Sequence, residues 1–173
     1  RDACKKVYPK ANHQSCWVHI CRNIIKNVRP KDRKAVLADL KPVYTAENAD
    51  TAATELAKFR EKYSKLYPKM IEKFSDTRSL FSFYAFPQEI RQSIYTTNII
   101  ENMNKQLKRT TKRKEQFPNE NALDRCAYCY YSNMNARFSD RTHRGFNQSH
   151  FAIEQMFEEK YSSTKSQGVA QVA

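Results

Sequence analysis

YTTNIIENMNKQLKRTTKRKE, residues 95–115, is the stretch from which the organisation of the chain can be worked out. No Gly or Pro interrupts residues 99–108, which therefore predict a helix, and Asn98 is expected as its N-cap because an Asn side chain can accept a hydrogen bond from a first-turn amide. At 3.6 residues per turn, one acid and three lysines share a face: Glu101, Lys105, Lys108 and Lys112. The predicted helix presents a single carboxylate among cations.

The carboxylate of Glu101 has two interpretations. In the first, Glu101 reaches back to a cap at Asn98 and pairs with Lys105 one turn later, a pairing that contributes about 0.2–0.5 kcal/mol to a helix. In the second, Glu101 is one of several carboxylates that hold Mg²⁺ for phosphodiester chemistry, and the cations beyond it bind nucleic acid. Spacing alone favours the first interpretation, because most helical glutamates have such a role.

The chain carries a strong excess of positive charge. Its 173 residues include 31 Lys and Arg against 18 Asp and Glu, a formal net charge of +13, and such an excess favours a polyanionic partner. Within residues 105–115, where Glu115 is the one acid, six cations would repel one another without a counter-charge, so we expect them to bind DNA phosphates. They are Lys105, Lys108, Arg109, Lys112, Arg113 and Lys114. A second, more dilute cluster comprises Arg22, Lys26, Arg29, Lys31, Arg33 and Lys34.

The composition favours a mainly α fold. Only 2 Gly and 6 Pro occur, too few for the many turns of a sandwich or barrel. Apolar residues at helical spacing extend over residues 21–84, and Asn48 or Asp50 is expected to begin a helix there. Breaks are expected at three prolines, Pro30, Pro42 and Pro68.

Other segments flank this helical region. Residues 14–20, QSCWVHI, are rich in residues that favour strands and predict one buried strand. After the basic stretch, a turn at Pro118 should precede a helix over residues 120–138, and another helix is expected over residues 151–161. Residues 162–173 are small and polar and predict a disordered tail.

The cysteines do not form a disulfide framework, because their number, five, is odd and no signal peptide or long apolar run accompanies them. A reduced, cytosolic compartment is therefore expected. Cys16 and His19 have the spacing of half a zinc finger, but on a strand their side chains would point to opposite faces, which disfavours zinc. Cys126 and Cys129 lie in an apolar helical run and are expected to be buried small hydrophobes.

Three further segments can be compared with known families. Residues 86–123 read FPQEIRQSIYTTNIIENMNKQLKRTTKRKEQFPNENAL, residues 7–24 read VYPKANHQSCWVHICRNI, and residues 31–46 read KDRKAVLADLKPVYTA. In this order and separation, the segments resemble the Mutator-type transposases of bacterial insertion sequences. The resemblance covers most of the chain and rests on the three segments together, since no one of them is specific by itself.

The resemblance implies a DDE transposase, in which two aspartates and a glutamate hold Mg²⁺ or Mn²⁺ for the cleavage and transfer of DNA strands. It implies Glu101 as the third acid, with Asn98 and Asn104 in the same motif as support. It also implies Cys16 and His19 as structural or active-site support, in an element of the last core strand and its exit. The two aspartates are implied upstream of Arg1, so we expect a C-terminal fragment that binds DNA and does not cleave it.

The resemblance also implies a domain organisation and partners. The fold would be the end of a ribonuclease-H-like α/β catalytic domain with an all-α insertion. Its segments would be the end of that core (1–21), the helical insertion (22–86), the catalytic-glutamate helix with the basic stretch (87–115), C-terminal helices (116–161) and the tail (162–173). A homo-oligomer at the bacterial nucleoid would bind double-stranded DNA of the element ends and the target, without membrane association.

One alternative from another class remains open: a non-catalytic, basic helical protein that binds nucleic acid, with Glu101 as a capping residue. A substitution of Glu101 by Gln separates the two, because it should abolish strand cleavage by a transposase and change little in a binding protein.

Overall fold

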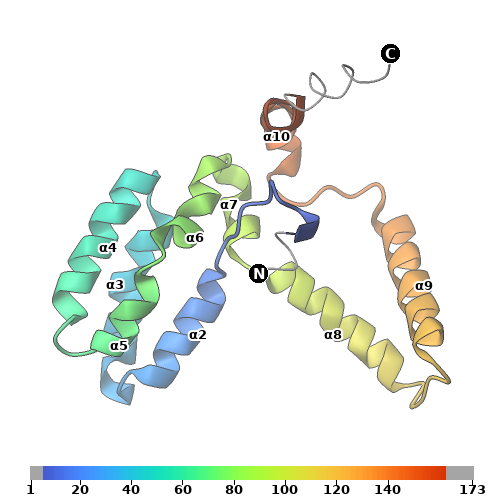
Figure 1. The fold of residues 1–173 in the computed structure, drawn as a ribbon, viewed down its shortest axis with the longest axis horizontal. Helices are drawn as coiled ribbons and strands as arrows, with labels where there is room; N and C mark the ends of the chain where they lie inside the picture. Colours follow the sequence, from blue (N-terminus) through green and yellow to red (C-terminus); the bar gives the residue numbers. More distant parts are fainter. Residues whose placement is uncertain (1–5, 163–173) are drawn as a thin grey trace. The chain divides into compact units, whose positions relative to one another are not determined.

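The computed structural model describes residues 6–162, and within this range the chain is helical and contains no strand (Figure 1). The expectation of a mainly α fold is confirmed for the described residues. The chain divides into two compact units, Arg1–Thr96 and Thr97–Ala173. Each unit is described by itself below.

The first unit is built from α-helices, with short 3₁₀ turns between some of them. In chain order these are α2 (Trp17–Asn27), η1 (Pro30–Asp32), α3 (Arg33–Thr45), α4 (Ala49–Tyr63), α5 (Pro68–Ile71), η2 (Glu72–Phe74), α6 (Thr77–Phe81), η3 (Ser82–Ala85) and α7 (Gln88–Tyr95). Figure 1 shows α3 and α4 lying side by side in this unit. The breaks expected at Pro30 and Pro68 are confirmed, since each proline is the first residue of a new element.

The strand predicted for residues 14–20 is wrong, because α2 begins within it at Trp17. Trp17 and Ile24 are buried and Ile20 packs against the core beside them. These positions match the 3.6-residue period of a helix, in which residues i, i+3 and i+7 share a face. The prediction treated residues 14–20 apart from residues 21–27 and so missed the helical period.

The residues just before α2 bind a segment far along the chain. The Gln14 side chain accepts hydrogen bonds from the Phe83 amide at 2.9 Å and from the Ser82 hydroxyl at 2.7 Å. The Ser15 amide donates to the Ser79 carbonyl at 2.7 Å. These contacts give polar backbone groups of this stretch hydrogen-bond partners without a sheet. A neighbouring strand is therefore not required here, although the composition favours a strand.

Helices α3 and α4 build much of the core of the first unit. Val36, Leu40 and Val43 of α3 are completely buried. Pro42 lies inside α3, so the expected break there is wrong. A proline in a helix costs about 3 kcal/mol, and the burial of Leu40 and Val43 near it offsets that cost. Helix α4 begins as expected, because the Asn48 side chain accepts a hydrogen bond from the Thr51 amide at 2.9 Å.

Asp39 joins α3 to α4 and should make the stability of this unit sensitive to acid. Its carboxylate accepts hydrogen bonds from Lys62 Nζ and from the Tyr63 hydroxyl, both at 2.6 Å, and these lower the pKa of Asp39 below its ordinary value of 3.8, the Lys62 bond most of all. A lowered folded pKa stabilises the fold above the unfolded pKa, and this stabilisation is lost as the pH falls through the folded pKa.

We therefore expect Asp39→Asn to be less stable than the native chain at about pH 7, with the difference shrinking toward about pH 3. Urea unfolding followed by far-UV circular dichroism at both pH values measures the two free energies of unfolding. An equal difference at both pH values would contradict the role assigned to Asp39.

The second unit contains α8 (Asn98–Lys112), α9 (Glu120–Phe138) and α10 (Phe146–Ser162). The bounds predicted for the second of these are confirmed, and the Asn119 side chain caps it by accepting from the Ala122 amide at 2.9 Å. Helix α10 begins five residues before the predicted start at 151, directly after Gly145, whose positive φ of 85° makes the preceding turn. The tail predicted for 162–173 lies, except for Ser162, outside the described residues.

Candidate nucleic-acid interface

The residue that begins α8 differs from the prediction. Thr97, not Asn98, is the N-cap, because the first carbonyl of the helical hydrogen-bond series is that of Thr97, which accepts from the Glu101 amide at 2.8 Å. Asn98 is the first residue inside the helix and is exposed. Glu101 is therefore one position further into α8 than a capping box requires.

The side chain of Glu101 is oriented by a contact with the residue before the helix. The Thr97 hydroxyl donates a hydrogen bond to Glu101 Oε1 at 2.7 Å, and both residues are half-buried. A short bond of this kind to a carboxylate is stronger than one between neutral groups. The acceptor is Oε1 and not the second carboxylate oxygen of Glu101. The bond limits the orientations that the side chain can adopt.

An open groove of about 530 Å³ lies along one face of α8. Its described lining contains one acid, one amide and four cations, namely Glu101, Asn104, Lys105, Lys108, Arg109 and Lys112, and we call it the α8 groove. The face predicted from helical spacing is thus the face that lines it. Its one carboxylate lies near the start of the helix, and the cations occupy the next three turns.

Two tyrosines of α9 contact the polar residues of α8. The Tyr131 hydroxyl donates to Asn104 Oδ1 at 3.3 Å, and the Tyr130 hydroxyl donates to Gln106 Oε1 at 3.4 Å. Sequence analysis assigned no such role to α9. The contact with Tyr131 holds the amide of Asn104, a predicted motif residue, on the side of α8 that lines the groove.

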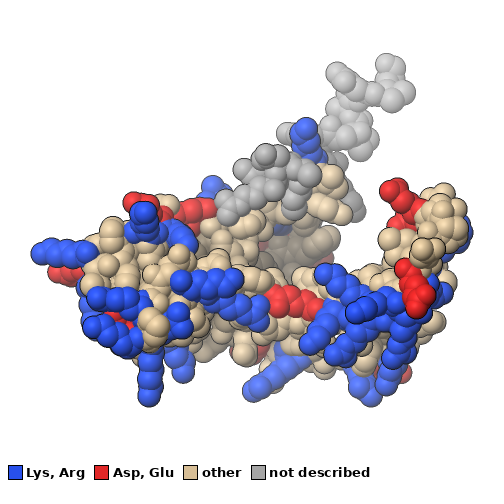
Figure 2. Space-filling view, turned by 90° about the horizontal axis from the view of Figure 1, so that it is seen from below, with Lys and Arg blue, Asp and Glu red and all other residues tan. Residues whose placement is uncertain are grey.

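The predicted DNA-binding cations are exposed. Lys105, Lys108, Arg109 and Lys112 lie on α8, Arg113 is its C-cap residue and Lys114 lies in the turn toward α9. In Figure 2, Lys and Arg side chains gather over the part of the surface formed by α8. The turn between α8 and α9 contains Glu115, whose positive φ of 56° reverses the chain. All six cations therefore extend from one helix and the turn that ends it.

The apolar side of α8 is only partly covered. Met103 and Leu107 are half-buried, whereas 62% of Ile100 and 42% of Ile99 are exposed, and no residue of α8 is fully buried. A helix with this distribution lies at the surface of its unit. Its polar face is accessible to a large partner along its length.

Cys16 and His19 belong to the first unit. Cys16 is the N-cap residue of α2 and is half-buried, and His19 is exposed in the first turn of the helix. Among residues 6–162, no group of three or more His, Cys, Asp or Glu side chains is arranged to hold a metal ion. Their assignment as support for the motif stays a prediction.

The cysteines of α9 are less buried than expected. Cys126 is half-buried and Cys129 is exposed, so the interpretation as fully buried hydrophobes is wrong. No other residue of α9 is fully buried either.

Sequence analysis missed two residues that contact the lining of the α8 groove. Thr97 was missed because it was assigned to the loop before a cap at Asn98. Once the cap is placed one residue earlier, Thr97 lies four residues before Glu101, a spacing at which two side chains on a helix can interact. Tyr131 is missed because its partner, Asn104, is 27 residues away. No local pattern relates two such positions.

Within the described part of the chain, every helix is too short or too polar to span a lipid bilayer.

Comparison with known proteins identifies relatives of this chain. A family model described as "Transposase, Mutator family" matches residues 1–140. The chain is 40% identical to the transposase for insertion sequence element IS905 of Lactococcus lactis subsp. lactis (strain IL1403). The match extends over 153 residues, which are 88% of this chain. It is 40% identical over 125 residues, 72% of the chain, to the transposase for IS1201 of Lactobacillus helveticus.

A third relative is the transposase for insertion sequence element ISRM3 of Rhizobium meliloti (strain 1021), 32% identical over 134 residues, which cover 76% of this chain. The matched region spans 39% of the length of the first relative and 34% of each of the other two. The family match includes the whole of α8 and all of α9.

Proposed function

Because the chain belongs to the Mutator family of transposases, we propose that it forms the part of an insertion-element transposase that carries the third acid of a DDE set, Glu101. In the intact enzyme this acid would act with two aspartates from outside the described residues, in a ribonuclease-H-like domain. The reaction would be the cleavage of DNA at the element ends and the transfer of those ends to a target.

The observation that carries this proposal is the composition of the α8 groove. One carboxylate, held in place by Thr97, lies in line with four cations on the same helix face. Cations that bind the phosphate backbone would position a DNA strand along α8, with the strand passing Glu101. The contact with Thr97 already restricts the conformations of the Glu101 side chain in the free protein, so less conformational entropy is lost when Glu101 binds a ligand.

The donor chemistry of Glu101 fits Mg²⁺ or Mn²⁺, which prefer carboxylate oxygens. The described residues supply one acid to such a site and no complete set of ligands. When bound, the metal would activate the attacking water or 3′-hydroxyl and stabilise the leaving oxygen. The described residues of this chain would supply only some of the groups of this site. Glu101 would contribute one ligand, and Asn104, held by Tyr131, would line the groove beside it.

The cations of α8 should bind DNA through its phosphates. Each phosphate contact releases counterions and adds about 0.9 to the slope of log affinity against log salt. In the triple variant Lys105→Gln, Lys108→Gln and Lys112→Gln, we expect this slope to fall by about 2 to 3. Fluorescence anisotropy with a short labelled DNA duplex between about 50 and 200 mM salt measures it.

The matched control for this variant removes three exposed cations elsewhere in the second unit, Arg125, Arg137 and Arg144, also by Gln. The net charge falls by the same amount in both variants. A slope that falls equally in the two would show a general charge effect and would contradict an α8 binding surface.

Two further parts of the proposal concern assembly and the chain by itself. An element has two ends that must be joined, so a homo-oligomer on DNA is proposed, acting at the bacterial nucleoid where its substrate lies. The described part of the chain by itself is proposed to bind DNA without cleaving it, because it supplies one acid to the metal site and no complete set of ligands.

The experiment that tests the catalytic proposal is the substitution Glu101→Gln in an intact transposase that contains this chain, with strand cleavage and DNA binding measured separately. Loss of cleavage with retained binding supports the proposal. Unchanged cleavage would instead favour a non-catalytic nucleic-acid-binding role, in which Glu101 only accepts the Thr97 hydrogen bond.

A further inference from the structure

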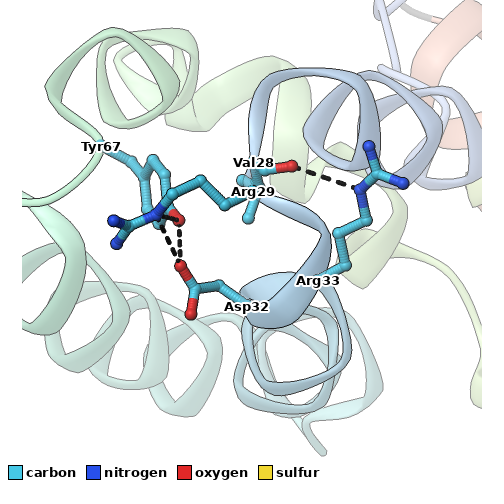
Figure 3. Close-up of polar contacts among 5 residues, drawn as sticks. All are labelled: Val28, Arg29, Asp32, Arg33 and Tyr67. Carbon is cyan, nitrogen blue, oxygen red and sulfur yellow. Dashed lines mark hydrogen bonds and ion pairs between the residues drawn. The ribbon is translucent and has the colours of Figure 1, made fainter.

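Two turns of the first unit are held together at one of its ends. Residues 28–32 lead from α2 into α3, and residues 64–67 lead from α4 into α5. Figure 3 shows Tyr67 against Arg29 and Asp32: the Tyr67 hydroxyl donates to Asp32 Oδ2, and Arg29 Nε contacts Asp32 Oδ2 at 3.0 Å and the Tyr67 hydroxyl at 3.1 Å. Residues 35 positions apart in sequence are thus joined. We call this part of the molecule the Tyr67 end.

The Tyr67 end is strongly basic. Residues 26–34 and 62–69 together contain one acid, Asp32, and eight cations, which are Lys26, Arg29, Lys31, Arg33, Lys34, Lys62, Lys65 and Lys69. The hydrogen bond from Tyr67, together with the attraction of Arg29 and Lys31, lowers the pKa of Asp32. Asp32 therefore stays ionised and is already engaged by Arg29 and Tyr67.

Some of these cations have partners within the unit. Arg33 Nε donates to the Val28 carbonyl at 3.2 Å (Figure 3), and Lys62 pairs with Asp39 at 2.6 Å. By contrast, Lys34, Lys65 and Lys69 are exposed and form no ion pair with any residue that the structure describes. Figure 2 is seen from below and shows several Lys and Arg side chains projecting from the first unit on this side.

A solvated basic surface is the simplest explanation of such a cluster, but two features argue against it. The contact between Tyr67 and Asp32 brings two basic turns together, which raises the repulsion among their lysines instead of lowering it. The one acid of the two turns is used to hold them together and does not pair with a lysine. An arrangement that gathers unpaired cations is explained by an external polyanion.

We propose that the Tyr67 end is a second DNA-contacting surface, which binds the phosphates of double-stranded DNA without reading its sequence. Lysine suits this role because its ammonium is a mobile point charge that reaches a phosphate from many directions. The choice of DNA as the polyanion rests on the proposed function, whereas the surface itself involves neither Glu101 nor α8. It would extend the contact of the protein with DNA beyond the α8 groove.

The test is the triple variant Lys34→Gln, Lys65→Gln and Lys69→Gln of the 173-residue chain. Lys31 stays in place because its charge acts on Asp32. With the loss of three phosphate contacts, we expect the slope of log affinity against log salt to fall by about 2 to 3. The probe is a labelled DNA duplex of mixed sequence, followed by fluorescence anisotropy, and a second duplex of different sequence should give the same fall.

The matched control is the triple variant Lys41→Gln, Lys58→Gln and Lys73→Gln. These lysines are exposed in the same unit, on α3, α4 and η2, and lie outside residues 26–34 and 62–69. We expect its slope to fall by less than about 1. Equal falls in the two triple variants would overturn the proposal, as would an unchanged slope in the variant of the Tyr67 end. If that variant loses helicity in far-UV circular dichroism, the single variant Lys69→Glu replaces it and should lower the slope by about 1.

Failure of this proposal and failure of the proposed function give different results. If only the α8 variant changes the salt slope, the Tyr67 end does not bind DNA and the proposed function is unaffected. If Glu101→Gln leaves strand cleavage intact, the catalytic proposal fails, and the binding measurements on the lysine variants keep their meaning.

Discussion

Glu101→Gln is expected to lower strand cleavage by an intact transposase that contains this chain by about 10³-fold or more. A carboxylate that binds a catalytic metal contributes several kcal/mol to the stabilisation of charge in the transition state, and about 1.4 kcal/mol corresponds to a factor of ten in rate. The Gln side chain has nearly the same shape and can still accept the Thr97 hydrogen bond, so α8 should remain intact. DNA binding should change by less than about threefold, because the proposed phosphate contacts come from the cations of α8 and not from Glu101.

Two variants make this experiment specific. Glu120→Gln is the matched control, since Glu120 is an exposed first-turn glutamate of α9 in the same unit, and it should retain native cleavage. Thr97→Val removes the hydroxyl that orients Glu101 and should lower cleavage by about 10- to 100-fold, the range found when a group that supports a metal ligand is removed. Cleavage of a labelled element-end duplex in Mg²⁺ is the readout. Native cleavage by Glu101→Gln would exclude Glu101 as a metal ligand.

Trp17→Ala is expected to destabilise the first unit by about 3–5 kcal/mol, the usual cost of replacing a buried aromatic residue by Ala. Only 1% of Trp17 is exposed. Its ring packs against those of Tyr44 and Phe74, with centroids 5.1 and 6.4 Å away, and its indole Nε1 donates to the Leu80 carbonyl at 3.1 Å. The substitution would leave a cavity and remove this donor from the Leu80 carbonyl.

A loss of this size is a large part of the roughly 5–15 kcal/mol that stabilises a typical domain. Urea unfolding followed by far-UV circular dichroism measures it without relying on fluorescence, because Trp17 is the single tryptophan of the chain. Tyr128→Ala, at a position that is 73% exposed, is the control and should cost less than about 0.5 kcal/mol. A loss below about 1 kcal/mol in Trp17→Ala would contradict the central position of this residue.

Local signals in the sequence predicted the parts of the fold that depend on residues near one another. The helix over Glu120–Phe138 was predicted with its bounds, and Asn48 was one of the two starts predicted for α4, because capping side chains bind amides two or three residues away. The face of α8 that carries Glu101 and the lysines was predicted from helical periodicity alone. The family was also evident from the order of three segments.

The errors arose where a local signal competed with distant contacts. Residues 14–20 have β-favouring composition, but the burial of Trp17 and Ile24 on one helical face determines α2. Pro42 is a helix breaker by itself, yet it remains inside α3 because its neighbours fill the core. At the start of α8, Asn98 and Thr97 are both good caps, and the backbone of Thr97 is the one that closes the first turn.

By itself, then, the sequence determined the helical class, the basic face of α8 with its one carboxylate, and the family, since each depends on composition or on spacing within short segments. The contact of Thr97 with Glu101 is local to the start of α8, but tertiary structure alone decided that Tyr131 holds Asn104 and that Tyr67 joins two basic turns. The last two join residues 27 and 35 positions apart. The physical reason is that such pairs form only when packing of the helices brings their side chains within hydrogen-bonding distance, and no periodicity in the chain encodes that distance.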